Sequence, residues 1–222
     1  MPAKLTALLG FNAGYVDTAG FLALNGLFAA HVTGNFVTLG ASFAHGTAGA
    51  LTKLSALPVF CLVVLLSRLV SVHLHARGQP AVSWLLLVKA VALLGAAVVM
   101  LVKGPFPDSD TWPAFTAGML LVGAMAIQNG VQRMYMASAP PSTLMTGTTT
   151  QVMIDLADMF RGVTGEERDA ALGRLRKMIR ALLAFAIGCA LAALAYIVAG
   201  MWCFALPPVV AAWTLVISRK ME

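Results

Sequence analysis

Eight apolar segments follow one another along the 222 residues of this chain, with only short polar connectors between them. Because a helix needs about 20 apolar residues to cross a bilayer, these segments use up almost the whole chain. Only 11% of the residues are charged, against about 25% in an ordinary soluble domain, which is too few to cover a soluble surface. The sequence therefore predicts an all-α, polytopic transmembrane helical bundle that forms one domain over residues 1–222. The segments are roughly 5–28, 32–46, 55–76, 82–103, 113–136, 143–160, 178–199 and 202–218.

The distribution of Lys and Arg predicts the orientation of the chain, because cytoplasmic loops carry an excess of these residues. Six basic residues lie between 161 and 180, and others stand at Lys4 and at 219–220, whereas loop 104–112 carries two aspartates. We therefore expect the N- and C-termini in the cytoplasm and loop 104–112 outside. The net charge of +6 then reflects cytoplasmic loops, and we expect no nucleic-acid partner.

Two of the segments are short and rich in Thr and Gly. Span 113–136 ends on the cytoplasmic side, and the basic stretch 161–180 lies on the same side. Segment 143–160 should therefore enter the membrane and return, or form a half-helix after an extended lead-in. The same argument applies to segment 32–46. The sequence thus predicts six full spans and two re-entrant or half-helix segments, and the alternative is seven or eight full spans.

Each half of the chain then reads span, short segment, span, span, in opposite orientations. This arrangement is an inverted repeat, which many transporters use. The halves are approximately residues 5–103 and 113–218. The sequence carries an echo of the repeat, because the Thr-Gly pair at 33–34 recurs 113 residues later at 146–147.

The Thr-Gly motifs are the first candidate site. The residues concerned are Thr33, Gly34 and Asn35 in the first short segment, and Thr146, Gly147 and Thr148 in the second. Glycine lets a ligand approach closely, a Thr hydroxyl can cap free N–H groups, and a helix N-terminus carries a partial positive charge. Two such ends meeting near the midplane predict a site for a small polar solute, with an anion preferred. The alternative is that the small residues only serve close helix packing.

Two carboxylates are candidates for ion or proton coupling. Asp17 lies near the middle of the first span, where a charged side chain costs about 3 kcal/mol and must face the protein interior or a wet cavity. Its alternative role is pairing with an Arg. Asp155 shares a helix face with Gln151 and Asp158, and we expect Asp158 to pair with Arg161 near the basic loop.

The amides Gln128 and Asn129 lie deep in span 113–136. We expect both to face the interior, to be hydrogen-bonded and to contact the solute. Arg68 and Lys89 also lie inside apolar spans, and we expect their long side chains to reach the membrane interface.

Four stretches of the sequence carry a resemblance to a known family. They are Gly14-Tyr-Val-Asp17-Thr-Ala-Gly-Phe-Leu22, Val32-Thr-Gly-Asn35, Gln128-Asn-Gly130 and Thr143-Leu-Met-Thr-Gly-Thr148. In this order and spacing the chain resembles, over essentially its whole length, the YoaK-like family of bacterial inner-membrane proteins. One departure is Gln151-Val-Met after a run of three Thr. The resemblance implies a polytopic protein of the bacterial inner membrane, but it implies no substrate, because the family is a domain of unknown function.

The function that these features predict is a small membrane transporter or channel for a small polar solute, an anion in preference, with proton coupling as an option. The sequence contains no P-loop, HExxH, GxSxG or paired-Cys motif, so we expect no enzyme, no cofactor and no metal. The expected partners are the lipid bilayer and the solute, and a homodimer is left open. The alternatives are a non-transporting scaffold or accessory protein, and a membrane-embedded enzyme acting on a lipid or quinone.

Overall fold

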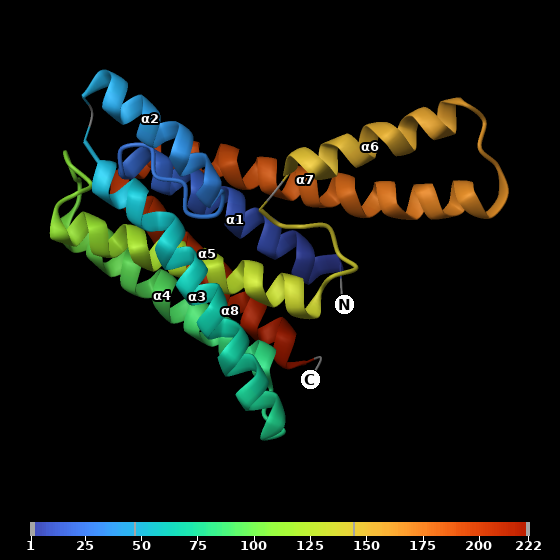
Figure 1. The fold of residues 1–222 in the computed structure, drawn as a ribbon, viewed down its shortest axis with the longest axis horizontal. Helices are drawn as coiled ribbons and strands as arrows, with labels where there is room; N and C mark the ends of the chain where they lie inside the picture. The colour runs from blue at the N-terminus through green and yellow to red at the C-terminus, as the bar shows by residue number, and fades with distance from the viewer. Residues whose placement is uncertain (1–2, 47, 144, 221–222) are drawn as a thin grey trace.

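The computed structural model describes residues 3–46, 48–143 and 145–220, and every regular element in these ranges is a helix (Figure 1). The elements are α1 (Ala3–Ala23), η1 (Val32–Gly34), α2 (Asn35–His45), α3 (Ala50–Ala76), α4 (Ala81–Lys103), α5 (Trp112–Tyr135), α6 (Met145–Phe160), α7 (Gly165–Ala199), η2 (Gly200–Ala205) and α8 (Leu206–Arg219). The predicted all-α bundle is confirmed. α1 begins and α8 ends at one end of the bundle, which we call the terminal end, and the α4–α5 connection lies at the opposite end, the loop end.

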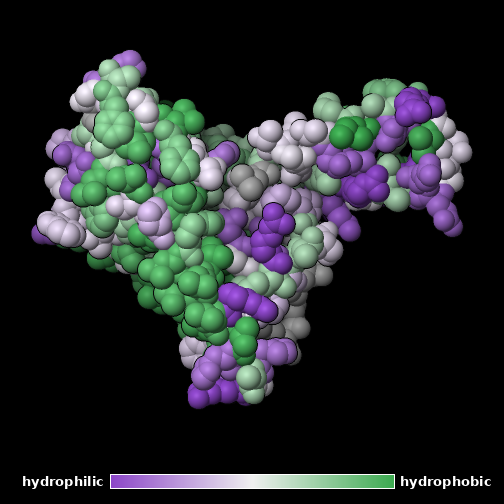
Figure 2. All heavy atoms as spheres, in the orientation of Figure 1, coloured by the Kyte–Doolittle hydropathy of each residue, from purple (hydrophilic) through white to green (hydrophobic). Residues whose placement is uncertain are grey.

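Several helices have the length and the surface of membrane spans. By length and hydropathy, α3, α4 and α5 are each able to cross a bilayer, and so is the stretch Gly165–Arg219, which holds α7, η2 and α8. Many large apolar side chains of α3 are exposed, and Figure 2 shows the apolar surface over this part of the bundle. A large contiguous surface of this kind is typical of contact with lipid. The chain is thus a polytopic membrane bundle, and the number of six full spans stays a prediction.

The first helix has a different environment from the other long helices. No residue of α1 between Leu5 and Gly20 is exposed, because α7 packs along one side and α5 and α8 pack along others. This position shields Asn12 and Asp17 from lipid, where polar side chains are costly. Asp17 is therefore an interior residue, as predicted, and so is Asn12.

Glycines set the distance between α1 and α7. A Cβ added at Gly14 would overlap the backbone carbonyl of Phe185, and one added at Gly188 would overlap that of Phe11. Backbones can approach this closely only where neither residue has a side chain. α1 and α7 are thus joined backbone to backbone through the middle of the molecule.

The helix contacts of one half recur in the other half. α1 packs on α7 as α5 packs on α3, and α2 packs on α3 as α6 packs on α7. In the same way α4 packs on α5 as α8 packs on α1. An inverted repeat of α1–α4 and α5–α8 predicts this exchange of partners. The bounds of the halves, 5–103 and 113–218, stay a prediction.

The two short helices share one burial pattern at the spacing of 113 residues. Asn35 and Ser42 are buried in α2, and the residues 113 positions later, Thr148 and Asp155, are buried in α6. Figure 1 shows that α2 and α6 run away from the middle of the molecule in opposite directions. The echo in the sequence therefore has a structural counterpart.

The seventh helix is longer than the predicted span 178–199, because α7 already begins at Gly165. Its 35 residues extend about 52 Å at 1.5 Å per residue, beyond the roughly 30 Å of a bilayer core. The basic stretch continues the helix because it contains no Pro and is rich in Ala, Leu and Arg, which favour helices. The first half of α7 and α6 form a projecting hairpin, the α6–α7 arm, whose surface carries both hydrophilic and hydrophobic side chains (Figures 1 and 2).

Candidate functional site

After α1 the chain turns back into the bundle, and Asp17 holds this first lead-in, residues 24–34. The Oδ1 atom of Asp17 accepts hydrogen bonds from the backbone N–H of Ala30 at 2.7 Å and of His31 at 3.3 Å. Asp17 lies about 9 Å before the end of α1, at 1.5 Å per residue. The lead-in therefore returns well below the end of the helix, and no Lys or Arg pairs with Asp17 in the described parts of the chain.

The side chain of Asn35 fixes the same lead-in from the other side. Its Oδ1 accepts the N–H of Phe28 and its Nδ2 donates to the carbonyl of Phe28, each at 2.8 Å. Both polar atoms of this buried amide are thus bound to backbone. The predicted role of Asn35 in contacting a solute is not supported by this geometry, which gives it a structural role.

A second lead-in, residues 136–143, follows α5 and is held by side chains of that helix. The Oε1 atom of Gln132 accepts the N–H of Ser142 at 2.9 Å and its hydroxyl at 2.6 Å, and Nε2 donates to the carbonyl of Pro140 at 2.6 Å. One turn deeper, Gln128 Nε2 donates to Ser142 Oγ at 2.9 Å. The chain therefore re-enters the bundle here as well.

The two lead-ins are held at corresponding positions. Asn129 Oδ1 accepts the hydroxyl of Thr143 at 2.7 Å, as Asp17 accepts the N–H of Ala30. Ala30 and Thr143 are 113 residues apart, like the two Thr-Gly pairs. Each short helix thus follows an irregular lead-in of turns and bends, and the entry of these segments into the membrane stays a prediction.

That the two Thr-Gly ends meet at one shared site stays a prediction, which the contacts of the short helices do not support. Each short helix packs on the helix that follows it, and each lead-in bonds within its own half. In the described ranges no hydrogen bond joins the two motifs. Thr33, Thr146 and Gly147 are exposed, Gly34 is half-buried, and Thr148 is buried with a hydroxyl that has no partner.

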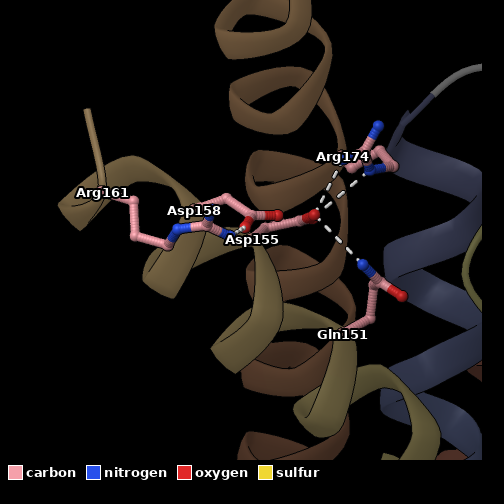
Figure 3. Close-up of polar contacts among 5 residues, drawn as sticks. All are labelled: Gln151, Asp155, Asp158, Arg161 and Arg174. Carbon is pink, nitrogen blue, oxygen red and sulfur yellow. Dashed lines mark hydrogen bonds and ion pairs between the residues drawn. The ribbon is translucent and has the colours of Figure 1, made fainter. Parts of the chain in front are cut away.

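Asp155 lies on the arm, where it joins α6 to α7 (Figure 3). Arg174 Nη2 donates to Asp155 Oδ1 at 2.8 Å, and Gln151 Nε2 donates to the same oxygen at 3.1 Å. The Arg174 guanidinium, aided by Gln151, holds the pKa of this carboxyl below its usual value. Asp158 and Arg161 form the expected pair at 3.6 Å, with exposed side chains. The geometry therefore favours a structural role for Asp155 over coupling.

Lys89 of α4 corrects another expectation. Its side chain does not reach the interface but is fully buried, and Nζ donates to Gln128 Oε1 at 2.5 Å. Gln128 Nε2 also donates to the carbonyl of Leu9 in α1 at 2.9 Å. The packing of a helix decides whether a lysine within it faces the membrane or the core. Here α4 packs with Lys89 on the side that faces α5.

A pocket of about 270 Å³ opens above the second lead-in at the terminal end. It is lined by Thr6, Ala7, Tyr135, Met136, Ser138, Ala139, Pro140, Lys177, Arg180 and Ala181. Pro140 connects this pocket, through Gln132 and Ser142, to Gln128 and Lys89. A chain of hydrogen bonds thus runs from the pocket wall to the buried lysine.

Sequence reasoning missed the part that Lys89 and Ser142 play in this network. Lys89 did carry a signal, because it stands within a largely apolar segment, about two turns from its start. Ser142 carried none, since a hydroxyl in a loop has no pattern. Among the described residues, no group of His, Cys, Asp and Glu is arranged to hold a metal ion.

Comparison with known proteins gives the family of the chain. No curated protein and no solved structure matches the sequence. Residues 5–217 match the model of the family described as "Protein of unknown function (DUF1275)", which includes the YoaK-like proteins that the sequence resembles. This helical membrane protein therefore belongs to the DUF1275 family.

Proposed function

We propose that the chain is a small transporter or channel that carries a small polar solute across a membrane. The observation that supports this most directly is the double re-entry of the chain, with buried polar side chains holding each lead-in. Interior polar residues are costly in a bilayer protein and typically mark solute or ion pathways. Discontinuous helices at related positions of two inverted halves are the usual setting of such pathways.

The same proposal puts the protein in the inner membrane of a bacterium, with both termini in the cytoplasm. Lys177 and Arg180 at the terminal end support this orientation, because basic residues accumulate on the cytoplasmic side. In this orientation the second lead-in faces the cytoplasm and the first lead-in faces outward. The two lead-ins then stand on the two sides of the pathway.

Flux into liposomes tests the proposal. Purified protein is reconstituted, and vesicle swelling is followed in potassium nitrate, chloride or formate with valinomycin, and separately in urea. Wild-type vesicles should swell faster than empty vesicles in at least one of these solutes and not in potassium gluconate. Equal rates in protein and empty vesicles for all of them would rule out this function and favour the scaffold alternative.

Asp17→Asn tests ion coupling without removing the lead-in. Asparagine keeps an Oδ1 acceptor for the N–H groups of Ala30 and His31 but cannot take up a proton. If Asp17 carries the coupled proton, flux loses its dependence on a pH gradient while the melting temperature changes little. Flux with an unchanged pH dependence would leave Asp17 with a structural role alone.

A further inference from the structure

A layer of polar residues divides the apolar core of the bundle. Asn12 of α1, Lys89 of α4, Gln128 of α5 and Thr214 of α8 each have an exposed fraction of 0%. One apolar cluster lies on the loop-end side of the layer, and a second lies on the terminal-end side. Four helices therefore contribute one polar side chain each at the same level of the bundle.

The hydrogen bonds within this polar layer leave a positive charge and an amide unsatisfied. Lys89 Nζ donates to Gln128 Oε1, and Thr214 Oγ1 donates to a carbonyl of its own helix, that of Ala211, at 2.7 Å. Lys89 forms no ion pair with any carboxylate in the described ranges. Neither Oδ1 nor Nδ2 of Asn12 has a partner.

Asn12 lies one turn along α1 from Leu9, whose carbonyl is bound by the Lys89–Gln128 pair. Gln128 Nε2 donates to the carbonyl of Leu9, and in an α-helix that carbonyl points along the axis toward residue 13. Asn12 is one turn after Leu9 and, like Leu9, is fully buried. Gln128 therefore links Lys89 to α1 one turn before the unpartnered amide of Asn12.

A buried charge without a counter-charge is strongly unfavourable, and a buried amide without a hydrogen-bond partner is unfavourable as well. A single anion within reach of both groups would relieve both costs, because Lys89 Nζ and Asn12 Nδ2 are both hydrogen-bond donors. One negative charge balances the one lysine, whereas a divalent anion would leave an excess negative charge in the core. The layer contains no carboxylate, so it is poorly suited to a metal cation.

We propose that the polar layer is a binding site for a small monovalent anion, of the size of chloride, nitrate or formate. This inference rests on the proposed transport function and names its substrate class. The pocket with Lys177 and Arg180 lies on the way from the terminal end, and its two basic side chains attract anions toward the second lead-in. Ser142, bound to both Gln128 and Gln132, separates the pocket from the layer.

Binding and flux are measured separately on the same variants. Binding is measured as the rise in melting temperature of the full chain in detergent when gluconate is replaced by nitrate, chloride or formate at constant ionic strength. A ligand that binds only the folded protein raises its melting temperature. Lys89→Met removes the charge and keeps the length of the side chain, so it should abolish this rise and lower anion flux at least tenfold.

Two further variants keep the test decisive. Lys103→Met removes an exposed lysine from the end of the same helix and should leave both measurements unchanged. Asn12→Leu removes the unpartnered amide, so the protein should fold even if Lys89→Met does not. We expect Asn12→Leu to raise the melting temperature in gluconate and to reduce the anion-dependent rise severalfold.

The possible failures are distinguishable. If wild-type vesicles carry an anion and both Lys89→Met and Asn12→Leu carry it equally well, the site is wrong and transport stands. If no anion crosses but a Lys89-dependent rise in melting temperature remains, the site stands and transport is wrong. If wild-type vesicles carry protons but no anion, and Lys89→Met stops this proton flux, Lys89 is a proton carrier. The anion site is then overturned.

Discussion

The two halves of the molecule follow one backbone path with different side chains. In the first half, one carboxylate and one amide, Asp17 and Asn35, hold the lead-in through its backbone. In the second half, Gln128, Asn129 and Gln132 hold it largely through the hydroxyls of Ser142 and Thr143. The same backbone path can therefore be held by different side chains. The re-entrant path is common to both halves. Only the second lead-in is connected, through Gln128, to Lys89.

The long-helix contacts also differ between the halves. α1 and α7 meet backbone to backbone at Gly14 and Gly188. The corresponding pair of helices, α3 and α5, has room for a side chain at Gly123, because an added Cβ would lie 3.8 Å from Val63 Cγ2. One interface is therefore fixed by backbone and the other by side chains. Side chains can change rotamers and backbone cannot, so the α1–α7 pair should tolerate substitution far less.

The largest effect is expected from Gly14→Ala. The added methyl group would overlap the carbonyl of Phe185, and overpacking of this kind costs about 3 kcal/mol or more when backbone has to move. Gly123→Ala is the matched control and should change the free energy of unfolding by less than about 1 kcal/mol, since a helical alanine is favoured over glycine. Unfolding in mixed detergent measures both variants. Similar losses at the two positions would refute the distinction between the interfaces.

An intermediate effect is expected at the paired positions of the short helices. Asn35→Ala leaves the N–H and carbonyl of Phe28 without partners, which should lower the free energy of unfolding by about 2 kcal/mol. Thr148, at the corresponding position of α6, has a buried hydroxyl without a partner. Thr148→Val should therefore be neutral or raise stability by up to about 1 kcal/mol. A loss at Thr148→Val as large as at Asn35→Ala would mean that its hydroxyl is engaged after all.

The smallest effect concerns acid. The Asp155 carboxyl has a pKa below its usual 3.8 because Arg174 hydrogen-bonds to it. A lowered pKa in the folded state contributes stability above the usual value, and this stability is lost as the pH falls through the folded pKa. The contact of α6 with α7 should therefore loosen below a pH of about 4. Spin-label distances across the arm should broaden there.

The first half supplies the control for that measurement. α2 is joined to α3 by Lys53 Nζ, which donates to Ser42 Oγ at 2.5 Å, and the nearby carboxylate of Asp110 bonds to the start of α3 and not to α2. Spin-label distances between α2 and α3 should stay constant over the same range of pH. In Arg174→Gln the arm should be loose already at neutral pH. Equal acid sensitivity of the two helix pairs would contradict the assignment to Asp155.

The fold was predictable where charge and length are decisive. The basic stretch 161–180 and the aspartates of loop 104–112 restricted which segments can cross, and this led to the lead-ins before α2 and α6. The relative placement of the two Thr-Gly ends was not predictable, because it depends on which neighbour each short helix packs against. The Asp155–Arg174 contact joins two helices and has no local pattern for the same reason.

The buried site was harder to predict than the fold. A lysine in an apolar segment fits both a side chain that reaches the interface and one that is enclosed. Only the packing of α4 against α5 distinguishes the two for Lys89. Asn12 was visible as a polar residue in the first span, but its lack of a partner is a property of the assembled core.

The continuity of α7 has a mechanical consequence. The helix contains no Pro from Gly165 to Ala199, so its part in the arm and its part against α1 form one stiff rod. A force on the α6–α7 arm is delivered, as torque, to the backbone contact at Gly188 and from there to α1, which carries both Asn12 and Asp17.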